Sequence, residues 1–376
     1  MQFFPALHGM RGLAALAVLL FHWKGSFPKV SMDLKEVRFL GTEWDLFLFI
    51  DLGWNGVHWF FVLSGFLLAS QLMHSQLDGQ AIGRFWQRRL VRIYPAVWLQ
   101  LSLLLPFTWL VGLAGSLGWF QVLANYLLWP ASLGGAPFYN GVYWTLPLEL
   151  SFYLLLPFIV LLHRRIGFWP VIALAVLITV AWRLNIIWEH EARNAARVQA
   201  SALRNLLPGM LAIFMAGYAV TRFPQNLSDR SRYGWLVVVL AIYVAWHMLV
   251  RYAMKTGLDQ NLWMMLFWEI GLAGIIALII GLLLRPLWGF GWLAWRPLTW
   301  LGDLSYGIYL WHFPVLRLLP KLFPGDWHST SGSLLALAIC IVVTLPLAMA
   351  SYHWVERPLM DFIARRQQHR RSLQPA

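Results

Sequence analysis

Cysteine is almost missing from this sequence: among 376 residues, Cys340 is the single thiol. One cysteine allows neither a disulfide within the sequence nor a paired-cysteine metal site, and its apolar neighbours indicate a packed side chain. Charge is scarce as well, because only 12% of the residues are charged, with 16 acidic residues against 29 lysines and arginines. Soluble globular domains carry about 25% charged residues, so this composition excludes that class of protein.

Apolar and aromatic residues take the place of the missing charge. Hydrophobic residues make up 60% of the sequence, and 24 residues are tryptophan. These values predict an all-α polytopic membrane protein with the lipid bilayer as its surroundings. The formal net charge of +13 is attributed to basic residues that collect at the cytoplasmic ends of membrane helices, so no nucleic acid is expected as a partner.

We expect about ten membrane-spanning helices, counted as stretches of about 20 mostly apolar residues. The predicted spans lie near residues 7–24, 55–74, 94–113, 144–163, 167–188, 205–222, 234–251, 263–284, 304–320 and 333–355. Residues 114–143 are apolar but are interrupted by glycine and proline, which leaves two alternatives, an eleventh short helix or a re-entrant segment. One transmembrane domain over residues 1–361 and a basic cytoplasmic tail over residues 362–376 are expected.

Basic residues set the expected orientation. Arginines occur in every loop that an inward N-terminus would place in the cytoplasm, so both termini are expected on the cytoplasmic side. Under this topology Arg183 is counted among the basic residues of the opposite side. The first apolar stretch is expected to be a retained span, because Arg11 and His22 interrupt it and no cleavage site precedes Lys24.

The first span carries two residues that are costly in a membrane, Arg11 and His22, within HGMRGLAALAVLLFHW. At about 100° per residue, the separation of eleven residues returns His22 to within about 20° of the direction of Arg11. At a rise of about 1.5 Å per residue, the two positions lie about 16 Å apart along the helix axis. Both therefore lie on one face at different depths, which predicts one wall of a polar channel.

Other ionisable residues inside the predicted spans are candidates for function because an intramembrane charge is costly. They are His58, Glu149, His247, Glu269, His312 and Glu356. His247 and Glu269 have no motif around them and are expected to be structural. His58 is either a cavity residue or simply solvated near the outer interface. Glu149 follows Pro147 in YWTLPLELSF, and it is expected either to orient a histidine or an arginine or to form a structural salt bridge.

The second span and the segment after it supply further polar residues. Ser64 lies in FFVLSGF, where small residues allow helices to pack closely. Arg88, Arg89 and Arg92 lie in RFWQRRLVRIYP at a predicted cytoplasmic helix boundary. Such a cluster either sets the orientation of the helix in the membrane and contacts anionic lipids, or it binds a phosphate-bearing ligand. The second alternative rests on the match between guanidinium groups and phosphate geometry.

The segment LGDLSYGIYLWHFP contains Ser305, Tyr306 and His312. A spacing of three residues places Tyr306, Tyr309 and His312 on one side of a helix. Two interpretations remain open for this side, a cavity wall and an aromatic belt with a hydrogen-bonded histidine.

Taken in order, these motifs resemble the bacterial acyltransferase-3 family of integral-membrane O-acyltransferases. The resemblance rests on the arginine and histidine of the first span, FFVLSGF, RRLVRIYP, WTLPLELSFYLLLP, LGDLSYGIYLWHFP and the closing YHWVERPL. It implies transfer of an acyl group, commonly acetyl, from cytoplasmic acyl-CoA to a hydroxyl of a cell-surface or exported carbohydrate, such as lipopolysaccharide O-antigen or an exopolysaccharide. It also implies the bacterial inner membrane as the location. Acyl-CoA is expected as a co-substrate, and neither a permanently bound cofactor nor a metal is expected.

Residue by residue, the family's essential pair matches Arg11 and His22, and its RRxxR motif matches Arg88, Arg89 and Arg92. An SGNH-type domain is fused to some members of the family. No such domain follows here, so a stand-alone form is expected.

The expected mechanism makes His22 the base that removes the acceptor's hydroxyl proton while the oxygen attacks the thioester. Arg11 would contact the CoA phosphates or hold the entrance for the pantetheine arm, and the RRxxR arginines would bind the nucleotide end of CoA. Glu149 would orient or repolarise a group in the cavity. Residues expected to line the cavity or to donate to the oxyanion are Ser64, Ser305, Tyr306 and His312. A route in which His22 is first acylated remains an alternative.

The competing function is a transporter or flippase for polysaccharide or lipid-linked glycan, without acyl transfer. In such a protein the same intramembrane polar residues would line a permeation path. Transporters often consist of two related halves, and no such halves are found in this sequence.

Overall fold

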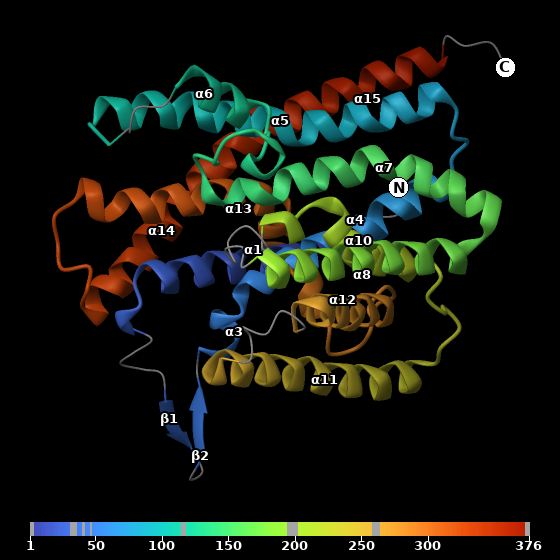
Figure 1. The fold of residues 1–376 in the computed structure, drawn as a ribbon, viewed down its shortest axis with the longest axis horizontal. Coiled ribbons are helices and arrows are strands. Elements are labelled where there is room, and N and C mark those ends of the chain that lie inside the picture. Colours follow the sequence, from blue (N-terminus) through green and yellow to red (C-terminus); the bar gives the residue numbers. More distant parts are fainter. Residues whose placement is uncertain are drawn as a thin grey trace. The chain divides into compact units, whose positions relative to one another are not determined.

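The described residues of the computed structural model are 4–30, 36–39, 42–45, 47–113, 118–193, 202–257 and 264–372. They form a helical chain with one short antiparallel hairpin (Figure 1). The predicted all-α polytopic membrane fold is confirmed. Contacts within the chain divide it into two compact units. Unit 1 comprises Met1–His74 and Phe158–Asp303, and unit 2 comprises Ser75–Pro157 and Leu304–Ala376.

Unit 1 begins with the first membrane helix. Its elements are α1 (Pro5–Ser26), β1 (Glu36–Phe39), β2 (Thr42–Asp45), α3 (Leu48–Asp51), the 3-10 turn η1 (Gly53–Asn55), α4 (Gly56–Met73), the last part of α7 (Thr145–Ile166), α8 (Phe168–Arg193), α10 (Leu207–Val220), α11 (Asp229–Thr256), α12 (Met264–Leu282), the 3-10 turn η5 (Gly291–Ala294) and the first part of α13 (Arg296–Leu322). The two strands pair with Glu36 opposite Asp45.

Glycines allow close packing around α4 in unit 1. A Cβ atom at Gly56 would lie 2.4 Å from the carbonyl oxygen of Ala14 in α1. A Cβ atom at Gly217 of α10 would lie 1.9 Å from the carbonyl oxygen of Val62 in α4. Real Cβ atoms do not approach oxygen so closely, so any larger residue would force these helices apart. The small-residue packing predicted for the second span is therefore confirmed, and α4 contacts both α1 and α10.

Unit 2 begins with α5, a helix of 32 residues. Its elements are α5 (Gly79–Leu110), α6 (Trp119–Tyr126), the 3-10 turns η2 (Ala131–Leu133) and η3 (Gly141–Trp144), the first part of α7, the last part of α13, α14 (Thr330–Ser351), the π-helical turn η6 (Tyr352–Glu356) and α15 (Arg357–Ser372). The side chain of Asp78 caps α5 by accepting from the backbone N–H of Ala81 at 2.6 Å. The boundary predicted between residues 361 and 362 falls inside α15.

Each of the ten predicted spans overlaps an observed helix. Within the described residues, seven helical segments are long and apolar enough to cross a membrane: Pro5–Ser26, Gly53–Met73, Gly79–Leu110, Gly141–Ile166, Phe168–Glu189, Asp229–Met254 and Thr330–Gln368. The predicted spans 205–222 and 263–284 correspond to the shorter apolar helices Leu207–Val220 and Leu266–Leu282. The span predicted at 304–320 corresponds to part of α13, which is not among the seven. The protein is thus a multi-pass membrane protein, and the count of ten stays a prediction.

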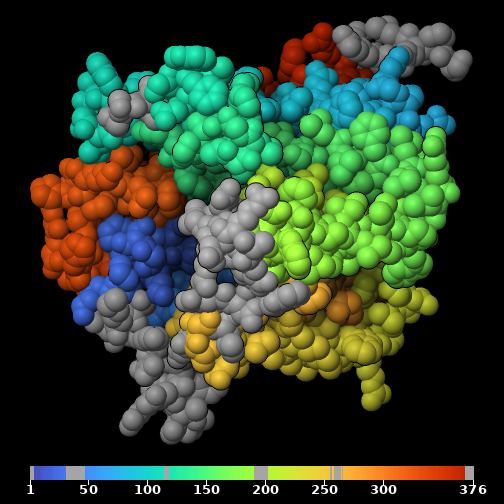
Figure 2. All heavy atoms as spheres, in the orientation of Figure 1, coloured from blue at the N-terminus to red at the C-terminus, as the bar shows by residue number. Residues whose placement is uncertain are grey.

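The region 114–143 contains the short helix α6, one of the two alternatives considered for it; residues 114–117 lie outside the described residues. Its 8 residues extend only about 12 Å, far less than the about 30 Å of a hydrocarbon core. Asn125 holds the following turn, because its amide donates to the carbonyl of Pro137 at 3.1 Å and its oxygen accepts from the N–H of Tyr139 at 2.7 Å. Apolar side chains of α6 lie on the surface of unit 2, in the teal part of Figure 2, and Trp119 is 78% exposed.

Candidate functional site

Arg11 and His22 lie on one uninterrupted helix of unit 1. Helix α1 begins at Pro5, whose fixed φ suits the first helical position, and continues to Ser26. Because the helix is continuous from Arg11 to His22, the predicted separation holds, and the two positions lie about 16 Å apart along the helix axis. Both side chains are partly buried.

The ring of His22 has a defined tautomer. Its Nδ1 lies 3.1 Å from the carbonyl oxygen of Val18, one turn earlier in α1. A carbonyl oxygen only accepts, so Nδ1 must carry the proton of this hydrogen bond. In the neutral ring the basic lone pair is then on Nε2, which is the arrangement that a general base needs.

The turn of α1 that carries Arg11 packs against η5 and the beginning of α13. A Cβ atom at Gly12 would lie 2.7 Å from the carbonyl oxygen of Leu298, so the two segments are in direct backbone contact. One turn before Arg11, His8 approaches Asp303 with 3.3 Å between Nδ1 and Oδ1. This contact places a histidine and a carboxylate beside the helical face of Arg11.

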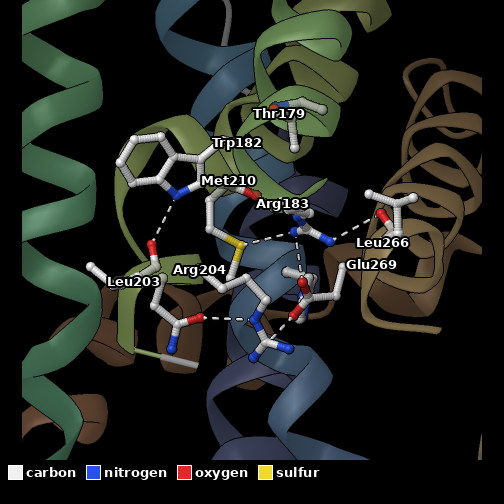
Figure 3. Close-up of polar contacts among 12 residues, drawn as sticks. Thr179, Trp182, Arg183, Leu203, Arg204, Met210, Leu266 and Glu269 are labelled. Atoms are coloured by element: carbon white, nitrogen blue, oxygen red, sulfur yellow. Dashed lines mark hydrogen bonds and ion pairs between the residues drawn. The ribbon is translucent and has the colours of Figure 1, made fainter. Parts of the chain in front are cut away.

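A buried ion cluster in unit 1 joins three helices (Figure 3). Arg183 of α8 forms an ion pair with Glu269 of α12 at 2.7 Å, and the two side chains are only 2% and 1% exposed. The guanidinium of Arg183 also donates to the carbonyl oxygens of Gly209 at 2.8 Å and Leu266 at 3.3 Å. The second oxygen of Glu269 lies 3.8 Å from Arg204. Opposite charges and backbone carbonyls together offset the desolvation of this cluster.

His58 belongs to the same cluster. Its Nε2 lies 3.5 Å from Glu269, and the residue is 1% exposed. Its ring lies beside the rings of Trp54 and Trp268, at centroid distances of 5.3 and 6.4 Å. The alternative that His58 is simply solvated is therefore wrong. Ser64, two turns later in α4, is partly buried.

Glu269 and Arg183 are two residues of this cluster whose surroundings were predicted from the sequence. Glu269, expected to be structural, is fully engaged in the ion pairs. Arg183, expected among the basic residues of the outer side, is instead buried in α8. The sequence contained an indication of this burial, because Arg183 lies inside the predicted span 167–188, where an arginine requires a partner.

A second polar cluster in unit 1 surrounds Asp51, which is buried. Lys24 of α1 and Arg251 of α11 both form ion pairs with its carboxylate. Nearby, His247 donates from Nδ1 to the carbonyl of Tyr243 at 2.8 Å, and its Nε2 accepts from the Asn55 amide at 3.2 Å. Both nitrogens of His247 are thus occupied, as expected for a structural histidine.

In unit 2 the RRxxR motif meets the closing motif of the sequence. Arg92 of α5 forms an ion pair with Glu356 at 2.8 Å, and the other Glu356 oxygen accepts from the Ser351 hydroxyl at 3.0 Å. The guanidinium of Arg92 also lies over the ring of Tyr306, 5.3 Å from its centroid. The hydroxyl of Tyr306 donates to the carbonyl of Ile93 at 2.9 Å. The structure therefore brings together Arg92 and Tyr306, which were predicted separately.

The other arginines of the motif have different surroundings. Arg88 donates to the side-chain oxygen of Gln367 in α15 at 2.5 Å. Arg89 lies 5.8 Å from the centre of the Phe85 ring.

Glu149 accepts a hydrogen bond from Tyr153, one turn later in α7, at 2.8 Å. His312 is fully buried and donates from Nδ1 to the carbonyl of Ile308 at 2.8 Å. Ser305 is also fully buried. These contacts fit the interpretation of His312 as a hydrogen-bonded histidine of the bundle interior.

Unit 2 also contains an uncharged hydrogen-bond network that was not predicted from the sequence. Gln100 of α5 accepts from the Tyr143 hydroxyl at 2.6 Å and from the Asn140 amide at 3.1 Å. The amides of Gln100 and Asn140 both donate to the carbonyl of Leu310, at 2.7 and 2.9 Å. The position of Gln100 inside a predicted span indicated such a network, since a buried side-chain amide must be hydrogen-bonded.

Residues 4–353 match the sequence family described as "Acyltransferase domain", acyltransferase 3. The chain belongs to the acyltransferase-3 family. The resemblance inferred from the motifs is therefore confirmed.

Several bacterial relatives of this acyltransferase-3 protein are similar over most of its length. The O-acetyltransferase OatA of Staphylococcus aureus is 26% identical over 383 residues, covering 95% of this chain and 57% of the relative. The peptidoglycan O-acetyltransferase OatA of Listeria monocytogenes is 23% identical over 386 residues, covering 95% and 56%. YrhL of Bacillus subtilis is 26% identical over 398 residues, covering 95% and 55%. The chain spans just over half the length of these relatives, and no solved structure gives a significant match.

Proposed function

We propose that this acyltransferase-3 protein is a membrane O-acyltransferase that moves an acyl group, commonly acetyl, from cytoplasmic acyl-CoA to a hydroxyl of a cell-surface or exported carbohydrate. The observation that carries the proposal is the Nδ1 hydrogen bond of His22 in the first membrane helix. This bond places the basic lone pair of the neutral ring on Nε2, the atom proposed to accept the acceptor's hydroxyl proton. The family match over residues 4–353 supports the reaction class.

The proposed acceptor is a class of compounds, namely carbohydrates with free hydroxyl groups. Lipopolysaccharide O-antigen and exopolysaccharide follow from the family resemblance. The name of the Listeria relative adds peptidoglycan, whose sugars also carry free hydroxyls. All three acceptors require the same chemistry, which is attack of a sugar oxygen on a thioester.

His22 is assigned the role of general base. Its Nε2 takes the hydroxyl proton as the sugar oxygen forms a bond to the thioester carbon. The carbon–sulfur bond then breaks, and CoA leaves as a thiolate that takes up a proton. Arg11, on the same helix face but nearer the end expected in the cytoplasm, binds a CoA phosphate or holds the entrance for the pantetheine arm.

The RRxxR arginines are assigned different roles. Arg88 and Arg89 are proposed to bind CoA phosphates through charge-assisted hydrogen bonds. Arg92 already has a buried carboxylate partner in Glu356, so we assign it a positioning role in unit 2. Glu149, Ser64, Ser305 and Tyr306 remain proposed cavity or oxyanion residues, and His312 is proposed to be structural.

Single-turnover acyl transfer tests the proposal. Purified wild-type protein is mixed with radiolabelled acetyl-CoA and an acceptor extract, beside His22→Ala and Arg11→Ala. His328→Ala is the matched control, because His328 lies in an exposed turn before α14. We expect CoA release from the wild type and from His328→Ala, and none from His22→Ala.

Label retained on the protein would indicate a covalent acyl-enzyme, and label found only on the acceptor would indicate direct transfer. Equal release from the wild type and from His22→Ala would contradict the role of His22. Glycan translocation by a protein that releases no CoA with any acyl donor would instead support the transporter function.

A further inference from the structure

Unit 1 contains a cavity of about 760 Å³ at one end of its helices. Its floor is apolar and buried, and is formed by Phe66 of α4, Val160 of α7 and Val220 of α10. All three residues lie near the C-terminal ends of their helices. A volume of this size lies within the range of about 300–1,000 Å³ that small-molecule sites occupy.

The rim of the cavity is strongly basic. Three exposed arginines and two histidines line it, namely Arg164, Arg222, Arg285, His74 and His163. Among the described residues of the lining, none is acidic. The carboxylate of Asp229 lies outside the lining, 3.9 Å from Arg285, and is 63% exposed, so water weakens its effect.

Helix capping accounts for Arg164, which donates to the carbonyl of Met73 at the end of α4 at 3.3 Å, but it does not account for Arg222 or Arg285. Buried Arg232 donates to the carbonyl oxygens of Leu282 and Arg285, at 2.7 and 2.5 Å, and thereby caps the end of α12. Arg285 donates instead to the carbonyl of Gln225, at 2.6 Å. Arg222 lies over the ring of Phe168, 5.8 Å from its centroid. The Phe168 ring orients the guanidinium group of Arg222, and the Gln225 carbonyl orients that of Arg285. Both partners are uncharged, so they do not cancel the positive charge of the two arginines.

Aromatic packing fixes the wall on the Arg222 side. The ring of Phe168 stacks on Tyr218 with a centroid distance of 6.0 Å and an interplanar angle of 20°. The hydroxyl of Tyr218 is hydrogen-bonded to Nδ1 of His163 at 2.6 Å. Phe168 and Tyr218, which lie behind the lining, therefore connect Arg222 to His163, so this side of the rim is preorganised for a ligand.

The balance of charge favours an anion. Each of the three helix C-termini contributes about half a negative charge, which together offset about half of the charge of three arginines. A net positive rim remains, and guanidinium forks bind phosphate oxygens through paired hydrogen bonds. The ligand must also be partly apolar, because the floor consists of phenylalanine and valine.

We propose that this cavity binds an anionic phospholipid, with its phosphate on Arg222 and Arg285 and an acyl chain along the apolar floor. A basic rim at the ends of membrane helices lies at the depth of lipid headgroups, and an apolar floor below it lies at the depth of acyl chains. The phosphates of acyl-CoA share the anionic part of this chemistry, so acyl-CoA is the second arm of the test.

Native mass spectrometry of the detergent-purified protein tests the proposal with phosphatidylglycerol, phosphatidylcholine and CoA as separate probes. The variant Arg222→Gln/Arg285→Gln removes two charges from the rim. The matched control Arg365→Gln/Arg366→Gln removes two exposed charges from α15. We expect phosphatidylglycerol affinity to fall at least about tenfold in the rim variant and to change less than about twofold in the control.

A second variant separates loss of binding from loss of folding. Ser70→Phe fills the cavity without a change of charge, because Ser70 lines it from α4. It is expected to lose phosphatidylglycerol while it elutes as wild type in size-exclusion chromatography. Equal phosphatidylglycerol binding by all proteins, or equal binding of phosphatidylglycerol and phosphatidylcholine, would overturn the proposal. Binding of CoA alone that depends on Arg222 and Arg285 would also overturn it and would identify the site with a nucleotide phosphate.

Discussion

Arg92 and Glu356 form an ion pair of 2.8 Å between residues that are 264 positions apart in the sequence. Glu356 is the last residue of a π-helical turn, and its second oxygen accepts from Ser351. The pair joins the arginine motif after the second predicted span to the closing YHWVERPL motif. π-Helical turns are rare and are often found at functional sites, because they change the direction of side chains within a helix.

Glu356→Gln is expected to destabilise the protein, because it leaves the Arg92 guanidinium without its buried carboxylate. Breaking a buried pair costs about 3–5 kcal/mol, and the partial exposure of Arg92 favours the lower end of that range. The measurement is the free energy of unfolding in detergent micelles. Asp361→Asn is the control, because its pair with Arg357 is half-exposed and is worth less than about 1 kcal/mol. Equal losses in both variants would contradict a special role for the buried pair.

Arg183 and Glu269 are expected to behave as one unit. Arg183→Met and Glu269→Gln should each lower the free energy of unfolding by about 3 kcal/mol or more, because each leaves the other charge buried. The double variant should cost less than the sum of the two, by about 1–3 kcal/mol. A double-mutant cycle measured by thermal unfolding tests this, and strictly additive losses would show that the two residues do not interact.

His22→Ala is expected to lower kcat by about 10²–10⁴-fold, the usual contribution of a general base. The melting temperature should remain close to that of the wild type, because the side-chain hydrogen bond of His22 to Val18 is internal to α1. Initial rates of CoA release at several acceptor concentrations separate kcat from KM. A loss that appears only together with a large fall in melting temperature would assign His22 a structural role instead.

Gly217→Ala is expected to weaken the packing of α10 on α4, because the added methyl group would lie 1.9 Å from the carbonyl oxygen of Val62. Overpacking of this kind costs about 1–3 kcal/mol or more. Gly83→Ala, inside α5, is the control, since its Cβ would meet open space. Thermal unfolding of the two variants should give opposite signs, because alanine is the better helix former by about 1 kcal/mol. A stable Gly217→Ala variant would mean that the helices separate at little cost.

The amino-acid sequence by itself determined the class of the protein and much of its first helix. Runs of about 20 apolar residues form helices in a bilayer for local reasons, since only their own backbone can satisfy their N–H and C=O groups. Arg11 and His22 could be placed on one face because both lie on the same helix, where the spacing alone fixes the geometry. The family could be identified because its motifs are short and contiguous.

Tertiary structure alone decided which charged residues pair. Nothing local relates Arg183 to Glu269, which are 86 residues apart, or Arg92 to Glu356, which are 264 residues apart. The basic rim around Arg222 and Arg285 likewise gathers residues from separate helix ends that the sequence presents as ordinary topology signals. A single sequence lacks this information because the partner of a buried charge is selected by helix packing. The desolvation cost of leaving such a charge unpaired then makes the chosen partner essential.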